Sequence, residues 1–144
     1  MATRVNLIDI AEATLNPHWS NDRLFGNVAS ALETTSGAIH TGVYIDTGSG
    51  TGFCAEHAAI ASMVTSGEYQ IARIVAVWRD GQDRLTILPP CGRCREFIRQ
   101  IDPYNIATTV LLSGGRTAPL SVLLPEWEWP EPESFSDASG DTVG

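Results

Sequence analysis

The sequence predicts an α/β fold in three layers, with a mixed sheet between helices on both faces. Three observations lead to this expectation. A helical repeat of apolar residues opens the chain, a hairpin pattern follows, and two later helices alternate with two apolar runs of strand length. Helices that connect such strands should make the strands parallel and the crossovers right-handed. The length of 144 residues fits one domain.

The first half of the chain supplies one helix and one hairpin. Residues 7–15 (LIDIAEATL) place apolar side chains three or four positions apart, which predicts an amphipathic helix that ends before Pro17. Residues 27–33 and 38–45 have strand character and are joined by a Thr-Ser-Gly turn, which predicts a hairpin. Gly42 interrupts the second of these strands, so we expect a bulge there.

The second half alternates helices with strands. A glycine-rich loop at 46–52 precedes an alanine-rich segment at 53–66, which we expect to be a helix that stops at Gly67. The later expected elements are a strand at 71–78, a helix at 91–100 after a double proline, a strand at 108–113 and a short last element at 120–124.

Charge is unevenly distributed and excludes several functions. All nine basic residues are arginine, so a lysine Schiff base, a lysine general base and a phosphate-binding lysine are impossible. The formal charge is −8, but six of the 17 acids lie in residues 126–144, where there is no base. Residues 1–125 therefore carry −2, nine arginines against eleven acids. Without a basic face, we expect no nucleic-acid partner.

The same patterns predict the domain organisation and the compartment. We expect one domain over residues 1–130, followed by an acidic, flexible tail over 131–144. No run of about 18 apolar residues occurs, which predicts no membrane span. The N-terminal segment carries acids within its apolar stretch, unlike a secretory signal. These features predict a cytoplasmic protein with no membrane partner.

Three cysteines carry the strongest chemical signal. Cys54 opens the helix expected at 53–66, whereas Cys91 and Cys94 open the helix expected at 91–100. An odd number of cysteines argues against a disulfide framework. A thiolate at a helix N-terminus faces unpaired N–H groups, which lower its pKa. Three such thiolates would form a soft site suited to one Zn²⁺ per chain.

Two alternatives compete with a catalytic metal site. Buried free cysteines can simply fill a core. Cys54-Ala-Glu-His57 with Cys91-Gly-Arg-Cys94 can also be a closed four-ligand zinc site, typical of a structural interaction module. Glu56 favours catalysis, because a carboxylate beside the metal can take a proton from water and return it to a leaving group. A C-x-E segment followed by P-C-x-x-C is the signature of zinc deaminases.

On these motifs, the chain resembles the cytidine deaminase family over residues 24–125. The resemblance includes CAEHAAI and PCGRCREFI at the two helix starts, the strand end TGVYID, and the C-terminal SVLLPEWEW. It implies a central mixed five-stranded sheet between the helices. It also implies a small-molecule nucleoside substrate and a homo-oligomer, a homotetramer or a dimer.

The resemblance implies Cys54, Cys91 and Cys94 as zinc ligands and Glu56 as the catalytic proton carrier. It implies hydrolytic deamination of a cytosine nucleoside, cytidine-like, deoxycytidine-like or blasticidin S-like, to the uracil form with release of ammonia. Deamination of another nucleobase or of a polynucleotide is the alternative activity.

Three thiolates around Zn²⁺ leave a net charge of −1, which weakens the acidification of a metal-activated water. Arg93 and Arg95 are candidates to offset that charge. Their alternative role is a solvated surface pair or a subunit contact.

The expected substrate pocket departs from the family pattern. Tyr44 and Asp46 replace an Asn-x-Glu pair that binds ribose hydroxyls, and His57 stands where the family often has arginine. These differences favour a modified nucleoside such as blasticidin S, whose cationic tail would suit two acid-flanked tryptophans. Core packing is the alternative role for those tryptophans. The substrate-binding candidates are Phe25, Tyr44, Asp46, Ala55, Trp127 and Trp129.

Overall fold

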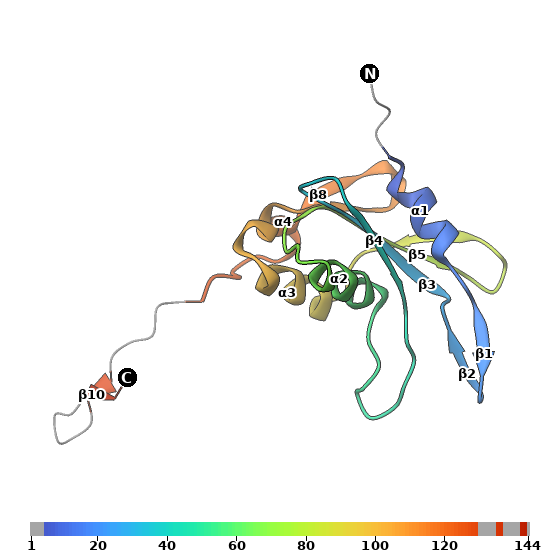
Figure 1. Cartoon of the computed structure of the whole chain (residues 1–144), viewed down its shortest axis with the longest axis horizontal. Coiled ribbons are helices and arrows are strands. Elements are labelled where there is room, and N and C mark those ends of the chain that lie inside the picture. Colours follow the sequence, from blue (N-terminus) through green and yellow to red (C-terminus); the bar gives the residue numbers. More distant parts are fainter. Residues whose placement is uncertain (1–4, 130–134, 137–141, 144) are drawn as a thin grey trace.

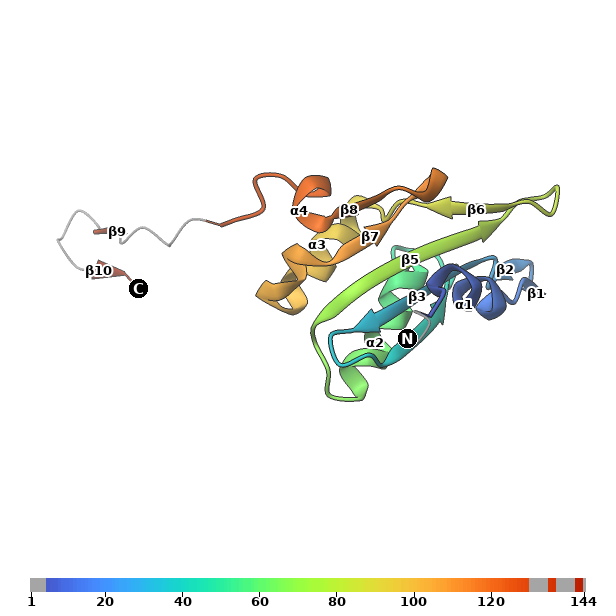
Figure 2. The same ribbon diagram turned by 90° about the horizontal axis from the view of Figure 1, so that it is seen from above.

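The computed structural model describes residues 5–129, 135–136 and 142–143. One sheet lies between α1 on one face and α2, α3 and α4 on the other (Figures 1 and 2). In chain order, the elements are α1 (Leu7–Thr14), β1 (His18–Ser20), β2 (Arg23–Phe25), β3 (Val28–Thr34), β4 (Ile39–Val43), α2 (Ala55–Thr65), β5 (Ile71–Arg79), β6 (Leu85–Leu88), α3 (Gly92–Ile101), the 3-10 turn η1 (Pro103–Ala107), β7 (Thr109–Leu111), the turn η2 (Ser113–Gly115), β8 (Thr117–Pro119), α4 (Leu120–Leu123), β9 (Phe135–Ser136) and β10 (Thr142–Val143).

The mixed sheet confirms the predicted fold class. Hydrogen bonds connect the strands in the order β4-β3-β5-β7-β8, and β6 adds a sixth strand beside β5. The pair β5–β7 is parallel, as expected for strands separated by a crossover helix, and the other pairs in this sheet are antiparallel. Strand β7 pairs with Arg73 and Ile74, whereas β6 pairs with the later residues Ala76–Arg79. Two strands therefore share one edge of β5.

The strands that the sequence pattern did not predict are all short. The hairpin of β1 and β2, and strands β6 and β8, have three or four residues each. Such runs are too short for a period-2 alternation to be distinguished from loop composition. The longer expected helices and strands are confirmed.

The core consists of two apolar layers, one on each face of the sheet. Successive side chains of a strand point into one layer and then the other. In β3, the small side chains of Ala29 and Ala31 face α1, while Leu32 faces α2. This alternation is the period-2 pattern of a strand buried on both faces. The layer beneath α2 and α3 is the larger one; its fully buried members are Leu32, Ala59, Ile60, Met63, Ile71, Ile74, Ile98, Val110 and Leu120.

Gly42 does not mark the expected bulge. It pairs with Ser30 in regular register, and the irregularity in β3 lies between Glu33 and Thr34, opposite β5. A Cβ at position 42 would come within 2.5 Å of both the Ala58 Cβ and the Ala59 backbone nitrogen. Glycine is required here because α2 packs directly against β4, and this contact sets the position of the start of α2.

The ends of the chain add two facts. None of the helices within the described ranges is long and apolar enough to cross a bilayer. The tail expected over 131–144 lies outside the described residues, apart from the short antiparallel pair of β9 and β10.

Candidate metal and catalytic site

Two helix N-termini meet at the cysteines. Cys54 is the N-cap of α2, Cys91 is the N-cap of α3, and Cys94 lies in the first turn of α3. The Cys54 and Cys91 Sγ atoms are 3.6 Å apart, and those of Cys91 and Cys94 are 3.4 Å apart. All three sulfur atoms lie within 4.8 Å of one another. Zn–S bonds of about 2.3 Å in a tetrahedron place sulfur atoms about 3.8 Å apart, so the cluster fits a zinc ion.

The surroundings of the three thiols differ. Burial raises the pKa of Cys54. Burial and the adjacent Glu56 carboxylate raise the pKa of Cys94 far above its usual range. Burial opposes ionisation of Cys91 as well, but the backbone N–H of Cys94 and the neighbouring thiols lower its pKa overall. A metal ion must therefore displace a tightly held proton from Cys94, and it offsets the cost of burying that thiolate.

Glu56 lies in the first turn of α2 with its carboxylate against the sulfur cluster. The residue is 6% exposed, and its Oε2 accepts a hydrogen bond from the Cys94 thiol at 3.1 Å. It also lines a small pocket with Ala76, Leu88 and Pro90. A carboxylate so close to the candidate ligands can exchange a proton with a water molecule activated at the metal.

His57 does not belong to the ligand set. Within the described part of the chain, the side chains that converge as possible metal ligands here are the three cysteines. The His57 ring instead stacks on Phe97 with centroids 4.4 Å apart, and its Nδ1 lies 3.5 Å from the Cys94 Sγ. Burial, and then the charge of Arg93, lower the pKa of His57, which favours the neutral imidazole. The geometry therefore favours a three-cysteine site over the closed four-ligand site.

Two arginines tie the ligand-bearing loops together. Arg95 donates to the Pro90 carbonyl at 2.8 Å and to the Leu123 carbonyl at 2.9 Å, so it connects the turn before Cys91 to α4. Arg93 donates to the Gly52 carbonyl at 3.3 Å, in the loop before Cys54. These contacts were not predicted, because a side chain bonded to a distant carbonyl leaves no local sequence pattern.

Comparison with known proteins places this geometry in a family. No family model matches the chain. The blasticidin-S deaminase of Bacillus cereus is 32% identical over 104 residues, which are 69% of this chain and 73% of that protein. The chain belongs to the cytidine deaminase family.

Solved structures of cytidine deaminases support this assignment. The enzyme from Burkholderia pseudomallei is 27% identical with a TM-score of 0.67, over 83% of this chain and 94% of that one. The enzyme from Mycobacterium leprae is 25% identical with a TM-score of 0.66, over 83% of this chain and 95% of that one.

Three of the expected substrate residues, Tyr44, Asp46 and Ala55, lie near the start of α2 and its cysteine in this cytidine deaminase family member. Ala55 is fully buried between a candidate ligand and Glu56. Tyr44 follows β4, and burial, the Asp46 carboxylate and then Cys54 raise its pKa. A bridge between Ile45 and Phe53 closes the loop over residues 46–52, so both Tyr44 and Asp46 lie beside the start of α2. Phe25 precedes Gly26, whose N–H donates to the Tyr44 carbonyl at 3.3 Å.

Trp127 and Trp129 lie at the opposite end of α3. They line a groove with Arg99, Gln100 and Pro103, and the Arg99 guanidinium is 5.3 Å from the Trp129 ring centre. At about 1.5 Å per residue, the helix separates Arg99 from the N-cap by about 12 Å. Within one chain, the structure does not bring these tryptophans to the sulfur cluster of the deaminase fold.

Proposed function

We propose that this protein is a zinc-dependent hydrolase that deaminates a cytosine nucleoside to its uracil form and releases ammonia. The proposal is carried by one observation. Three sulfur atoms with the spacing of zinc ligands lie against a buried carboxylate, in a chain of the cytidine deaminase family. Cys54, Cys91 and Cys94 would hold one Zn²⁺ per chain.

The residues of the chain then perform the proton transfers. When bound, Zn²⁺ supplies a Lewis acid that lowers the pKa of a water molecule. Glu56 accepts a proton from that water as its oxygen attacks C4 of the cytosine ring. Glu56 passes this proton to the adjacent ring nitrogen. It then carries the proton of the new C4 hydroxyl group to the amine, so that the C4–N bond breaks and ammonia leaves. Water and the cytosine amine thus become a carbonyl and ammonia, with no net change in the enzyme.

The substrate class follows from the loop beside the start of α2. We propose that Phe25, Tyr44, Asp46 and Ala55 contact the nucleoside. Asp46 can accept a hydrogen bond from a sugar hydroxyl, but Tyr44 cannot reproduce an amide at that position. The 32% identical relative is named for its action on blasticidin S, which supports a cytosine nucleoside with a modified tail as the substrate.

The tryptophans fit this proposal only in an oligomer. We propose a homo-oligomer, a tetramer or a dimer, in which Trp127 and Trp129 of one copy approach the site of another. Trp129 is 72% exposed in the single chain, which leaves its ring available for such a contact. In this assembly, the acidic residues Glu126 and Glu128 would favour a cationic substrate tail.

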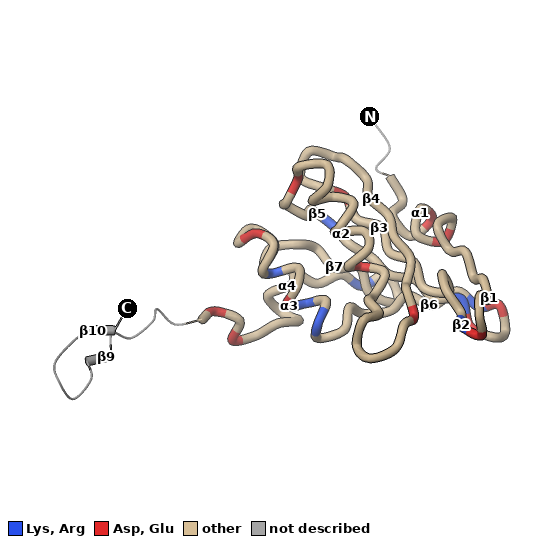
Figure 3. The backbone as a smooth tube through the Cα atoms, turned by 60° about the horizontal axis from the view of Figure 1, so that its bottom comes forward, with Lys and Arg blue, Asp and Glu red and all other residues tan. Residues whose placement is uncertain are grey.

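A polynucleotide substrate has less support. The arginines in the described residues are spread over several elements rather than gathered on one face (Figure 3). Several of them are already paired with acids, as Arg73 is with Glu33 and Arg99 is with Glu96. Few free positive charges remain along these elements to bind a phosphate backbone.

An ultraviolet deamination assay with metal analysis tests the proposal. We expect about one zinc per chain and turnover of at least one of cytidine, deoxycytidine, cytosine and blasticidin S. Glu56→Gln keeps the shape of the side chain and removes its basicity, so it should retain zinc and lower kcat by roughly 10²–10⁴-fold. Turnover of adenosine or guanosine alone would contradict the cytosine assignment, and full activity of Glu56→Gln would contradict the mechanism.

A further inference from the structure

We propose that His57 is a positioning residue that donates its Nδ1–H to the Cys94 thiolate and so adjusts the charge of the metal site. The proposal rests on the zinc site argued above and adds a residue that does not itself bind the metal. Its basis is two contacts that the Cys94 sulfur makes besides the one with the Cys91 sulfur, one with Glu56 and one with His57.

The imidazole is held in a fixed orientation. It stacks on Phe97 with an angle of 22° between the rings, and the Phe53 ring meets its edge at a centroid distance of 6.4 Å. The His57 side chain is buried, with 8% of the residue exposed. A buried ring between two aromatic side chains cannot rotate freely, so its Nδ1 stays near the sulfur at 3.5 Å. That distance suits an N–H···S hydrogen bond.

Metal binding would change Cys94 from a hydrogen-bond donor to an acceptor. As a thiol, it donates its proton to Glu56 Oε2 at 3.1 Å. As a thiolate ligand, it has no proton to donate, and an ionised carboxylate at that distance repels it. A donor must then stabilise the sulfur. Among the contacts of the described residues, the His57 Nδ1 lies 3.5 Å from this atom, and it becomes such a donor when it carries the ring proton.

The neighbouring donors are engaged elsewhere. The backbone N–H of Cys94 donates to the Cys91 sulfur at 3.4 Å. Arg95 binds the carbonyls of Pro90 and Leu123, and Arg93 binds the carbonyl of Gly52. The two arginines considered from the sequence therefore hold loops together, and the histidine is the group that meets the sulfur.

The chemical consequence concerns the net charge of the site. Three thiolates and Zn²⁺ sum to −1, which makes the metal a weaker Lewis acid. A hydrogen bond to a thiolate withdraws electron density from the sulfur, so the metal regains part of its acidity. The N–H dipole of His57 would also stabilise the buried Cys94 thiolate, which is the form of this residue that zinc binds, and would in that way strengthen zinc binding.

A matched pair of variants tests this role. His57→Asn keeps an N–H donor at the δ position. His57→Leu introduces a side chain that branches at the same carbon as asparagine but has no donor. Both lose the stacking on Phe97, so their difference isolates the hydrogen bond. We expect His57→Leu to lower the zinc affinity by about 10–100-fold, measured by competition with a chelator, and His57→Asn to recover most of it.

One spectroscopic and one kinetic measurement complement the measured zinc affinity. In the Co²⁺-substituted protein, the sulfur-to-cobalt charge-transfer band of His57→Leu should shift relative to that of wild type, because the thiolate becomes a stronger electron donor. The acidic limb of the pH profile of kcat should move to higher pH in the same variant. Phe97→Leu keeps the imidazole but removes its stacking partner, so it should give a zinc affinity between those of wild type and His57→Leu. This variant keeps the proposal testable if His57→Leu does not fold.

The role of His57 can fail while the metal site itself stands, and different results would show each failure. Equal zinc affinity and equal cobalt spectra in wild type, His57→Leu and His57→Asn, with deamination intact, would overturn the role of His57 alone. Wild-type protein that binds neither zinc nor cobalt would overturn the metal site and this proposal with it.

Discussion

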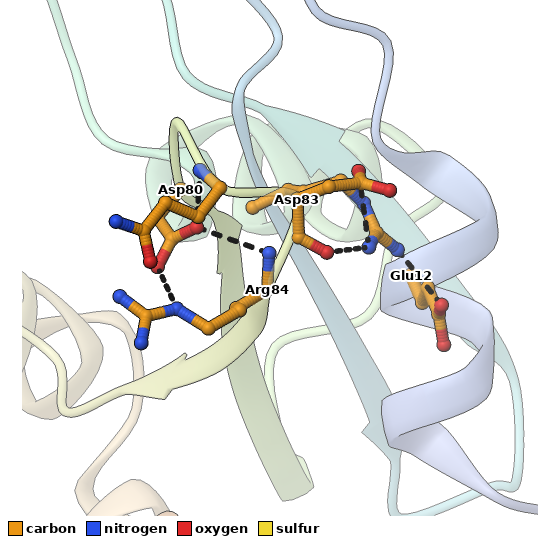
Figure 4. A network of polar contacts seen from close by, with 6 residues as sticks. Glu12, Asp80, Asp83 and Arg84 are labelled. Carbon is orange, nitrogen blue, oxygen red and sulfur yellow. Dashed lines mark hydrogen bonds and ion pairs between the residues drawn. The ribbon is translucent and has the colours of Figure 1, made fainter.

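Two polar clusters of this molecule differ in whether positive and negative side chains are paired within them. At the turn between β5 and β6, Arg84 pairs with Asp80 at 2.9 Å, and Arg79 pairs with Glu12 at 2.8 Å and with Asp83 at 3.5 Å (Figure 4). At the starts of α2 and α3, three thiols and a carboxylate converge instead, without a cation among their hydrogen-bond partners in the described residues.

The difference between the clusters is one of countercharge and burial. In the turn, each acid has an arginine beside it, and the backbone N–H of Arg84 lowers the pKa of the half-buried Asp80. In the sulfur cluster, burial raises the pKa of Cys54 and Cys94 because no positive charge compensates for ionisation. The turn cluster neutralises its own charges, whereas the sulfur cluster has no positive charge of its own and fits a metal cation.

Removing one sulfur should have the largest effect. Cys94→Ser leaves a poorer ligand at the most buried of the three positions, so we expect zinc content to fall well below one per chain and deamination to be lost. Metal analysis and the ultraviolet assay measure both quantities. Asp80→Asn is the matched control in the turn cluster, and it should keep zinc and activity. A Cys94→Ser variant with full zinc and full activity would break the comparison.

Removing the metal should make stability sensitive to alkaline pH. Cys54 and Cys94 have raised pKa values in the folded chain, whereas an unfolded thiol ionises near pH 8.5. Below about pH 8.5, these thiols are protonated in both states, and their contribution to the free energy of unfolding is complete. Above it, the unfolded state loses protons first, so the metal-free protein should lose stability as the pH rises, with Cys91 partly opposing the trend.

Urea unfolding of metal-free and zinc-loaded protein between pH 7 and pH 10 measures this effect. Because zinc holds the thiolates in the folded state, the loaded protein should show little of the alkaline loss, and its advantage should grow with pH. Identical pH profiles for the two forms would show that the thiols do not couple to the metal.

Changing the turn cluster should have the smallest effect. Glu12→Gln keeps the side-chain shape and removes one charge of a partly exposed ion pair, so the free energy of unfolding should fall by about 0–1 kcal/mol. Thermal unfolding at low and high salt checks this, and the difference from wild type should shrink at high salt. A loss that exceeds this range and persists in salt would mean that the turn has a role beyond surface pairing.

Local spacing explains why much of the site was predictable. A helix that begins with C-x-E, and another that begins with a proline and C-x-x-C, place four chemical groups within single turns of backbone. Helix periodicity and the strand alternation of β3 and β5 likewise depend on neighbouring residues. The fold class, the helices and the residue types at the two helix starts could therefore be predicted.

Contacts between distant segments explain the rest. Gly42 lies in β4 opposite Ala58 and Ala59 of α2, and only that packing shows why it must be glycine. The bonds of Arg95 to Pro90 and Leu123 join segments that no local pattern relates.

The sequence by itself identified the candidate metal ligands and the carboxylate that accompanies them, because Cys54 and Glu56 lie within one helical turn and Cys91 and Cys94 lie within another. Only the tertiary structure decided that the fourth candidate, His57, meets a sulfur rather than completing the ligand set. It also placed the tryptophans at the far end of α3. The physical reason is the same in both cases: a side chain's partner depends on how the helices pack on the sheet, and that packing is a property of the whole chain.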